Sequence, residues 1–194
     1  MEPTVNGTSG ARAGGSRSCS AVSSSSHFKV AKEMILEAHR RLHGYELIAL
    51  RPANVYGVGH FWAGSSGGAK MQALVACGID GGTARIPAAE AGANEYIYAK
   101  DVGRAIDLAV TSPAPKGLFF NIGTGVVTPF AALVETAKRV LPNLKVEIEG
   151  KVVEIERGQP LAIGAAKREL GWEPTYSLEA GLADYAKELR AARR

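Results

Sequence analysis

Apolar positions along the chain follow two alternating spacings, one typical of amphipathic helices and one typical of strands. The first helical stripe contains five apolar residues: Phe28, Ala31, Ile35, Ala38 and Leu42. It predicts a core-facing helix that begins with Ser25 or Ser26 as its N-cap and ends near His43. Gly44 favours the left-handed turn that commonly ends a helix.

Downstream, the pattern predicts strands and helices in turn. We expect strands at residues 46–50, 95–99, 118–122 and 145–148. We expect helices at residues 69–77, 102–110 and 165–170, with one more after Thr128 and a last one after Ser177. Asp101, Thr128 and Ser177 are the expected N-caps, and Pro129 takes the first position of its helix. Strands that alternate with helices of this length predict an α/β protein.

The first 26 residues differ from the rest. They contain eight serines, four glycines and two arginines, and Glu2 is their one acidic residue. A segment with so little apolar surface cannot offset the entropy cost of ordering. We therefore expect residues 1–26 to be a disordered leader, and residues 27–194 to be the folded part. Because no amphipathic helix is evident there, a tag-like leader is favoured over a transit peptide.

Composition narrows the class of protein. The 194 residues are 46% hydrophobic and 22% charged, as in ordinary soluble globular proteins. No apolar run approaches the roughly 20 residues that span a bilayer. The net charge is +4, but the sequence shows no basic face with interleaved aromatics, which nucleic-acid binding requires. Neither Cys19, Cys77 nor the four histidines have ligand spacing, so we expect no metal site and a cytoplasmic location.

A glycine-rich turn at residues 120–125 (FNIGTG) ends a predicted strand and opens a helix. Glu147 or Glu149 follows about twenty residues later, as in a dinucleotide-binding fingerprint. The third glycine of that fingerprint is missing, because Thr128 stands in its place. The alternative is a tight structural turn in which glycine permits a positive φ.

Four sequence blocks together resemble a known family. They are KVAKE at 29–33, LRPANVYG at 50–57, EYIYAKDV at 95–102 with FNIGTG at 120–125, and RELGWEP at 168–174. From Lys29 onward the chain resembles the C-terminal portion of an extended short-chain dehydrogenase/reductase of the NAD-dependent epimerase/dehydratase type, which acts on nucleotide sugars. The resemblance implies a partial Rossmann-like sheet followed by a substrate-binding subdomain. It also identifies the Gly123/Gly125 turn as structural.

The resemblance implies roles for particular residues. Lys29 matches the active-site lysine that hydrogen-bonds the nicotinamide ribose and lowers the pKa of a catalytic tyrosine. Pro52 and Ala53 match the turn whose backbone contacts the nicotinamide carboxamide. Asn54 matches an asparagine that hydrogen-bonds the sugar nucleotide, and it could equally be a turn former that bonds its own backbone. Arg157 lies near the arginine that grips the substrate diphosphate, and it could otherwise be a solvated ion-pair partner.

The chain also departs from the family pattern. The catalytic tyrosine belongs one helical turn before Lys29, and Ser25 stands there. The family's upstream Ser/Thr would fall near residues 11–13, where none stands, and its substrate-side arginine appears as Asn94. The Gly-x-x-Gly-x-x-Gly turn that holds the dinucleotide is missing. NAD or NADP is therefore implied by the family, whereas its binding by this chain is not.

Three hypotheses of function follow. The first is a truncated family protein that acts on or binds a nucleotide sugar, with a UDP-sugar favoured, and is inactive alone. The second is a split enzyme completed by another chain. The third is a non-catalytic nucleotide-sugar binding or interaction module. An apolar stripe left without the family's missing strands also predicts a partner, either a homo-oligomer or the N-terminal half. Sugar identity, and epimerisation as against dehydration or reduction, stay open.

Overall fold

A computed structural model describes residues 24–59, 66–113, 117–151 and 159–193, without the side chains of residues 24–27 and 66. The predicted leader lies outside these residues except for its last three, which open the first helix. The chain divides into two compact units, residues 1–47 and residues 48–194. No helix among the described residues is long and apolar enough to cross a membrane.

The first unit contains helix α1 (Ser24–His43), which confirms the first predicted helix. Gly44 follows with φ 71°, the left-handed conformation expected of a stop. The stripe predicted to face a core is exposed, with Phe28 68%, Ile35 66% and Leu42 77% accessible. The core-facing placement is therefore wrong, because no described residue of this unit covers the stripe. The exposure agrees with the expectation of an apolar face left without the family's missing strands.

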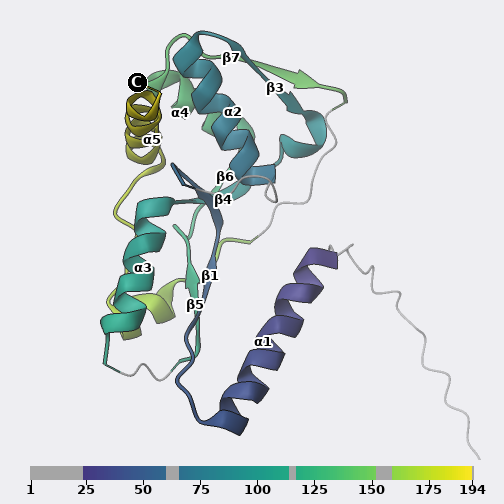
Figure 1. Cartoon of the computed structure of the whole chain (residues 1–194). Helices are drawn as coiled ribbons and strands as arrows, with labels where there is room; N and C mark the ends of the chain where they lie inside the picture. Colours follow the sequence, from purple (N-terminus) through teal and green to yellow (C-terminus); the bar gives the residue numbers. More distant parts are fainter. Residues whose placement is uncertain (1–23, 60–65, 114–116, 152–158, 194) are drawn as a thin grey trace, which may run out of the picture. The chain divides into compact units, whose positions relative to one another are not determined.

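The second unit contains seven strands within its described residues (Figure 1). They are β1 (Ala49–Pro52), β2 (Asn54–Tyr56), β3 (Thr83–Pro87), β4 (Asn94–Tyr98), β5 (Phe119–Ile122), β6 (Val127–Thr128) and β7 (Lys145–Glu149). The pairs β1–β5, β2–β4 and β3–β7 are parallel, and β6 pairs antiparallel with β4. This arrangement confirms the α/β class with parallel strands.

The strand predicted at 46–50 lies further along the chain, as β1 and β2, and these two strands join different sheets. The change of sheet occurs at Ala53, whose N–H donates to the Ile122 carbonyl at 2.9 Å. β3 was not predicted, although its alternating buried and exposed residues are a strand signal.

Helices cover these strands. They are α2 (Ser66–Asp80), α3 (Ala99–Thr111), α4 (Phe130–Val140) and α5 (Leu178–Ala192), with the short turns η2 (Ala88–Glu90) and η3 (Ala166–Leu170). The predicted cap Ser177 is confirmed, since its Oγ accepts from the Ala180 N–H at 3.1 Å. The other two predicted caps are wrong: Tyr98 precedes α3, Pro129 precedes α4, and neither helix has a side-chain cap bond.

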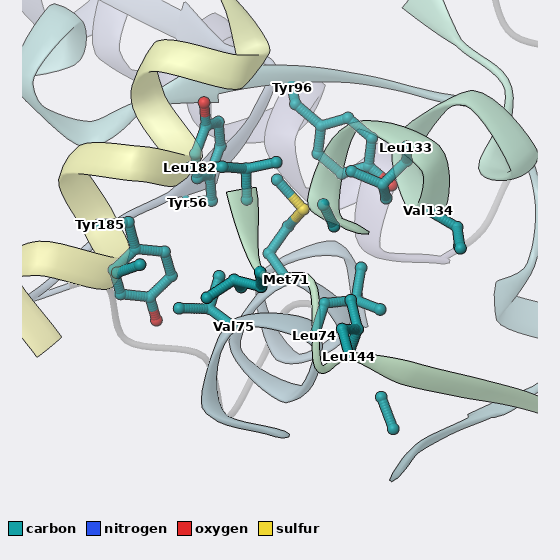
Figure 2. Close-up of a cluster of buried hydrophobic side chains, with 14 of the residues drawn as sticks. Tyr56, Met71, Leu74, Val75, Tyr96, Leu133, Val134, Leu144, Leu182 and Tyr185 are labelled. Carbon is teal, nitrogen blue, oxygen red and sulfur yellow. The ribbon is translucent and has the colours of Figure 1, made fainter. Parts of the chain in front are cut away.

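Two hydrophobic clusters form the core of this unit. The larger one joins α2, α4 and α5 to the tyrosines of β2 and β4, and Figure 2 shows Met71 and Leu74 within it. The smaller one contains Phe120, Ile122 and Trp172. Trp172 is fully buried and its indole Nε1–H donates to the Asp101 carbonyl at 2.9 Å, so it anchors the packing of this cluster.

Candidate functional site

Asn54 begins β2, directly opposite Tyr96 of β4. Its amide Nδ2 donates to the Glu95 carbonyl at 3.0 Å and lies 3.4 Å from Asn94 Oδ1. Its Oδ1 faces the start of α2, where even a Cβ on Gly67 would stand only 3.0 Å from Asn54 Cγ. The amide therefore links β2 to β4 and packs closely against the start of α2, at the place where the resemblance puts a substrate contact.

Glu95 is 7% accessible and carries two charge-assisted hydrogen bonds. Its Oε1 accepts from the Gly125 N–H at 2.8 Å, and its Oε2 accepts from the Leu161 N–H at 2.7 Å. A Cβ on Gly123 would lie 3.0 Å from Glu95 Cδ, so glycine is needed there for a close approach. The glycine-rich turn thus points its N–H at a carboxylate of the protein, which does not fit a site for a dinucleotide pyrophosphate.

Pro52 is the last residue of β1, and Ala53 lies between β1 and β2, where the chain changes sheets. Pro52 has no N–H, and the Ala53 N–H is taken by the Ile122 carbonyl. The backbone of these two residues could therefore offer a nicotinamide carboxamide only hydrogen-bond acceptors, since neither has a free N–H. Arg157 lies outside the described residues.

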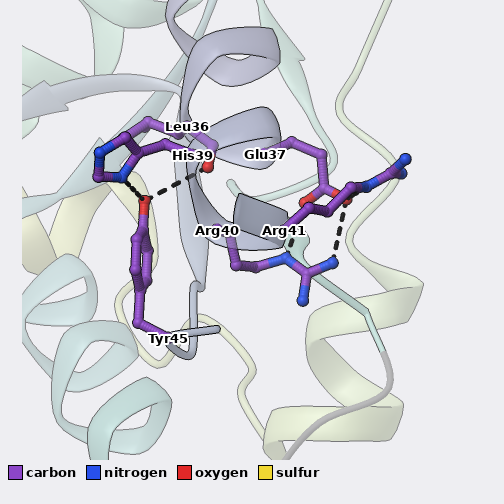
Figure 3. Close-up of polar contacts among 6 residues, drawn as sticks. All are labelled: Leu36, Glu37, His39, Arg40, Arg41 and Tyr45. Atoms are coloured by element: carbon purple, nitrogen blue, oxygen red, sulfur yellow. Dashed lines mark hydrogen bonds and ion pairs between the residues drawn. The ribbon is translucent and has the colours of Figure 1, made fainter. Parts of the chain in front are cut away.

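Lys29 is exposed on α1, in the first unit, and the Ser25 side chain lies outside the described part. Figure 3 shows the polar contacts further along α1. Glu37 accepts from Arg40 Nε at 2.9 Å and from Arg41 Nε at 2.7 Å. These hydrogen bonds, that from Arg40 first, lower the pKa of Glu37 to about 2.

A cavity of ≈ 370 Å³ lies within the second unit. It is lined by the tyrosines of β2 and β4, by residues 124, 126 and 128, and by residues 174–178. The Tyr98 and Tyr176 rings lie 4.8 Å apart, and the Tyr56 and Tyr98 rings lie 5.3 Å apart. None of the described residues predicted from the sequence as site residues lines this cavity.

Asp101 organises one wall of the cavity from the first turn of α3. It is fully buried and accepts from the Thr175 N–H at 3.0 Å, the Thr175 hydroxyl at 2.6 Å and the Tyr176 N–H at 3.0 Å. The sequence identified Asp101 as a helix cap, but the groups that donate these hydrogen bonds to it stand more than seventy residues along the chain. A local pattern has no signal for such a contact.

The tyrosines are held in their neutral form. Burial raises the pKa of Tyr96 to about 12, and its hydroxyl finds no hydrogen-bond partner among the described residues. Burial also raises the pKa of Tyr98, and so does its hydrogen bond to Asp184 Oδ2 at 2.9 Å. Lys100 completes this group by pairing with Asp184 and with Glu188.

Sequence reasoning also missed Lys70, a lysine in the first half of α2 that is only 2% accessible. Its Nζ donates to the Glu90 carbonyl at 2.6 Å and lies 5.4 Å from the centre of the Phe130 ring. Burial lowers the pKa of Lys70. The contact fastens η2 to α2. The described residues contain no cluster of three or more potential metal ligands.

Comparisons with known proteins agree with the family resemblance. The sequence model of the NAD dependent epimerase/dehydratase family matches residues 15–123. A UDP-glucose 4-epimerase of Mycolicibacterium smegmatis is 31% identical over 166 residues, which cover 80% of this chain and 49% of that protein. The chain thus spans about half the length of this curated relative.

Solved structures show the same fold. The UDP-glucose 4-epimerase of Thermotoga maritima, solved with UDP-glucose, matches with a TM-score of 0.69 and 29% identity, over 86% of this chain and 53% of that one. The UDP-glucose 4-epimerase of Thermus thermophilus, solved with NAD, matches with a TM-score of 0.70 and 21% identity, over 84% of this chain and 53% of that one. The second likeness supports the fold alone.

Proposed function

Because the chain belongs to the NAD dependent epimerase/dehydratase family, we propose that it binds a nucleotide sugar, with a UDP-sugar favoured, and performs no redox chemistry alone. The observation that supports this most directly is its 31% identity to a UDP-glucose 4-epimerase over 166 residues. The matched stretch includes the blocks around Asn54 and Glu95, which belong to the substrate side of the family fold.

The proposed ligand contacts are Asn54 and Arg157. Asn54 is already oriented by the hydrogen bonds of its amide nitrogen to the Glu95 carbonyl and to Asn94 Oδ1, so its amide oxygen has a fixed direction before any ligand arrives. A guanidinium at Arg157 suits a diphosphate because its planar fork can donate two parallel hydrogen bonds.

The proposed inactivity follows from two features. Ser25 stands where the family has its tyrosine, and an aliphatic hydroxyl beside Lys29 is too weak an acid to serve as the base. The Gly-x-x-Gly-x-x-Gly turn that holds the dinucleotide in the family is missing from this sequence, and the structural turn at residues 120–125 does not replace it, because its Gly125 N–H donates to Glu95. When bound, NAD would supply hydride transfer in this family, and we assign no step of it to the residues described here.

Thermal unfolding with ligands tests the proposal. Ligand that binds only the native state raises the midpoint by mass action. We expect UDP and UDP-glucose to raise the midpoint and NAD to leave it unchanged. Asn54→Ala should lose most of the UDP-glucose shift relative to its own ligand-free midpoint, and Asn143→Ala, at an exposed position, should keep it. A shift with NAD, or none with UDP-glucose, would refute the proposal.

The exposed stripe of α1 favours a second candidate, a split enzyme in which another chain covers this helix and supplies the cofactor half. Phe28 and Ile35 are each about two-thirds accessible. Exposure of these apolar side chains to water is unfavourable, and a partner surface that covered them would remove this cost. Co-expression with a chain that carries a Gly-x-x-Gly-x-x-Gly strand–helix unit should then give a stable complex. Phe28→Asp should abolish that complex, and Lys32→Asp on the same helix should weaken it less.

A further inference from the structure

We propose that His39 and His43, in the last two turns of α1, form a binding site for one divalent transition-metal ion of the nickel, copper and zinc class. The site goes beyond the proposed nucleotide-sugar function and lies entirely in the first unit. The two histidines are four residues apart on α1, so they lie on the same face of the helix, one turn from each other. The same spacing supplies two zinc ligands in H-E-x-x-H helices.

The two rings are already close to the geometry that chelation requires. Their centroids lie 4.1 Å apart and their planes are inclined at 43°. With a metal–nitrogen bond of about 2.1 Å and about 1.1 Å from ring nitrogen to ring centre, two imidazoles on one ion have centroids about 4.5–5 Å apart. Both histidines are exposed, so no packed core opposes the small side-chain rotation that opens the pair.

A chain of hydrogen bonds determines which nitrogen of His39 is available to the ion (Figure 3). The Tyr45 hydroxyl donates its single proton to the Leu36 carbonyl at 3.4 Å, so its oxygen accepts from His39 Nδ1 at 3.1 Å. Neutral imidazole has one N–H, and with the proton on Nδ1 the lone pair is on Nε2. Histidines that bind metals commonly make such a second hydrogen bond, which orients the ring. Tyr45 is therefore a positioning residue of this site.

The arginines nearest along the helix are already paired with a carboxylate. Arg40 donates to both Glu37 oxygens, at 2.9 Å and 3.1 Å, and Arg41 Nε donates to Glu37 at 2.7 Å. Figure 3 shows this group on one side of α1 and His39 with Tyr45 on the other. The guanidinium groups therefore point away from the imidazoles, and their repulsion of a bound cation is reduced.

The ligand atoms select the kind of ion. Imidazole nitrogen suits nickel, copper and zinc, whereas magnesium and calcium require oxygen ligands. The described residues contain no group of three or more potential ligands, so water takes the remaining positions and the ion is exchangeable. We expected no metal site from the sequence because no carboxylate or cysteine accompanies the histidines, and a pair on one helix face needs neither.

Isothermal titration calorimetry of the full chain with Ni²⁺ tests the site. After one imidazole binds, the other is held near the ion at an effective concentration of about millimolar or above, so we expect His39→Gln and His43→Gln each to weaken binding at least about tenfold. His27→Gln is the matched control, because it removes a histidine from the same helix twelve residues before His39. It should leave the affinity unchanged, and Mg²⁺ should give no saturable heat.

Nuclear magnetic resonance of the imidazole nitrogens tests the geometry, with Zn²⁺ as the diamagnetic probe. We expect Zn²⁺ to shift the resonances of His39 Nε2 and of one nitrogen of His43, and to leave His39 Nδ1 protonated. Tyr45→Phe should weaken Ni²⁺ binding about threefold, because the His39 ring loses its orienting bond. Zinc on His39 Nδ1, or unchanged affinity in Tyr45→Phe, would contradict the assigned arrangement.

Far-ultraviolet circular dichroism shows that α1 is retained in each variant before affinities are compared. Ni²⁺ that both His39→Gln and His43→Gln bind as tightly as the unaltered chain would be an adventitious ion only, and would overturn the proposal. Equal weakening by His27→Gln, or saturable binding of Mg²⁺, would also overturn it. All histidine variants should keep the thermal shift with UDP-glucose, so failure of this site is distinguishable from failure of the proposed function.

Discussion

Replacing Gly181 with alanine measures how closely α5 approaches the tyrosines beneath it. A Cβ at this position would lie 3.0 Å from Tyr56 Cζ and 3.3 Å from Tyr98 Cγ, with the Tyr56 hydroxyl closer still. Carbon atoms prefer separations of about 3.5–4.0 Å, so Tyr56 must move. Tyr56 is only 2% accessible and is packed against Tyr96 and Tyr98, which leaves it little room.

Two effects oppose each other in this variant. Overpacking of a buried site costs about 1–3 kcal/mol, whereas alanine gains about 1 kcal/mol over glycine in a helix interior. Because the nearest obstacle belongs to a rigid, buried aromatic side chain, we expect the overpacking cost to lie in the upper part of that range, about 2–3 kcal/mol. The net loss is then about 1–2 kcal/mol. For a chain of this size that loss lowers the midpoint by about 2–8 °C. Urea denaturation followed by circular dichroism gives the free energy directly.

Gly103→Ala on α3 is the matched control, since a Cβ there meets nothing within 4 Å. It should raise the free energy of unfolding by about 0.5–1 kcal/mol. Tyr56→Phe removes the nearest atom and should recover part of the loss when combined with Gly181→Ala. If Gly181→Ala is as stable as the unaltered chain, the packing of α5 on Tyr56 is not as described.

Three further outcomes are expected. Asp101→Asn should lower the free energy of unfolding by about 2–4 kcal/mol, because the neutral amide has one acceptor oxygen and cannot replace both charge-assisted hydrogen bonds of the carboxylate. Asp107→Asn, on the exposed side of the same helix, should have little effect in the same urea titration. Glu37 has a pKa lowered to about 2, so its stabilisation of α1 is present above its ordinary value of 4.5 and is lost as the pH falls toward 2; far-ultraviolet circular dichroism should show this loss, and Glu37→Gln should remove it. Tyr96 has a pKa raised to about 12, so its contribution to the stability of the folded state is complete below pH 10 and is lost as the pH rises through about 12. Phenolate absorbance should show Tyr96 ionising last or only with unfolding, and Tyr96→Phe should reduce the alkaline loss of stability.

Local signals in the sequence predicted most of the elements. Ser177, which caps α5, and Gly44, which adopts a positive φ after α1, act through neighbours within a few residues. Short sequence patterns are sufficient to predict such local contacts. The same patterns missed β3, although alternation of Ala84 and Ile86 with exposed neighbours was readable at that position.

Sequence predictions were wrong where a residue contacts a partner that is distant along the chain. Asp101 and Thr128 are both good cap residues, yet Asp101 bonds to the segment before α5, and α4 is preceded by Pro129 without a side-chain cap. The strand predicted at 46–50 was displaced because pairing with β5 and β4, and not local propensity, determines where β1 and β2 lie.

The candidate site was predictable only through the resemblance to a family. The spacing of residues does not distinguish Lys29 from any other surface lysine. By local pattern, Asn54 could equally be a turn former. The structure gives Asn54 a bond across strands, which no local pattern implies. The tyrosine cavity lies on residues from four separate stretches of chain, so its existence depends on tertiary packing that the sequence does not display.

The change of sheet at Ala53 has a consequence for how the second unit unfolds. One short run of chain places Leu50 and Val55 beside the smaller hydrophobic cluster and Tyr56 inside the larger one. Because Val55 and Tyr56 are consecutive residues, neither cluster can lose its part of β2 without displacing the part that belongs to the other. The two clusters should therefore melt in a single cooperative step, and native-state hydrogen exchange should give Val55 and Ile122 the same opening free energy as Met71.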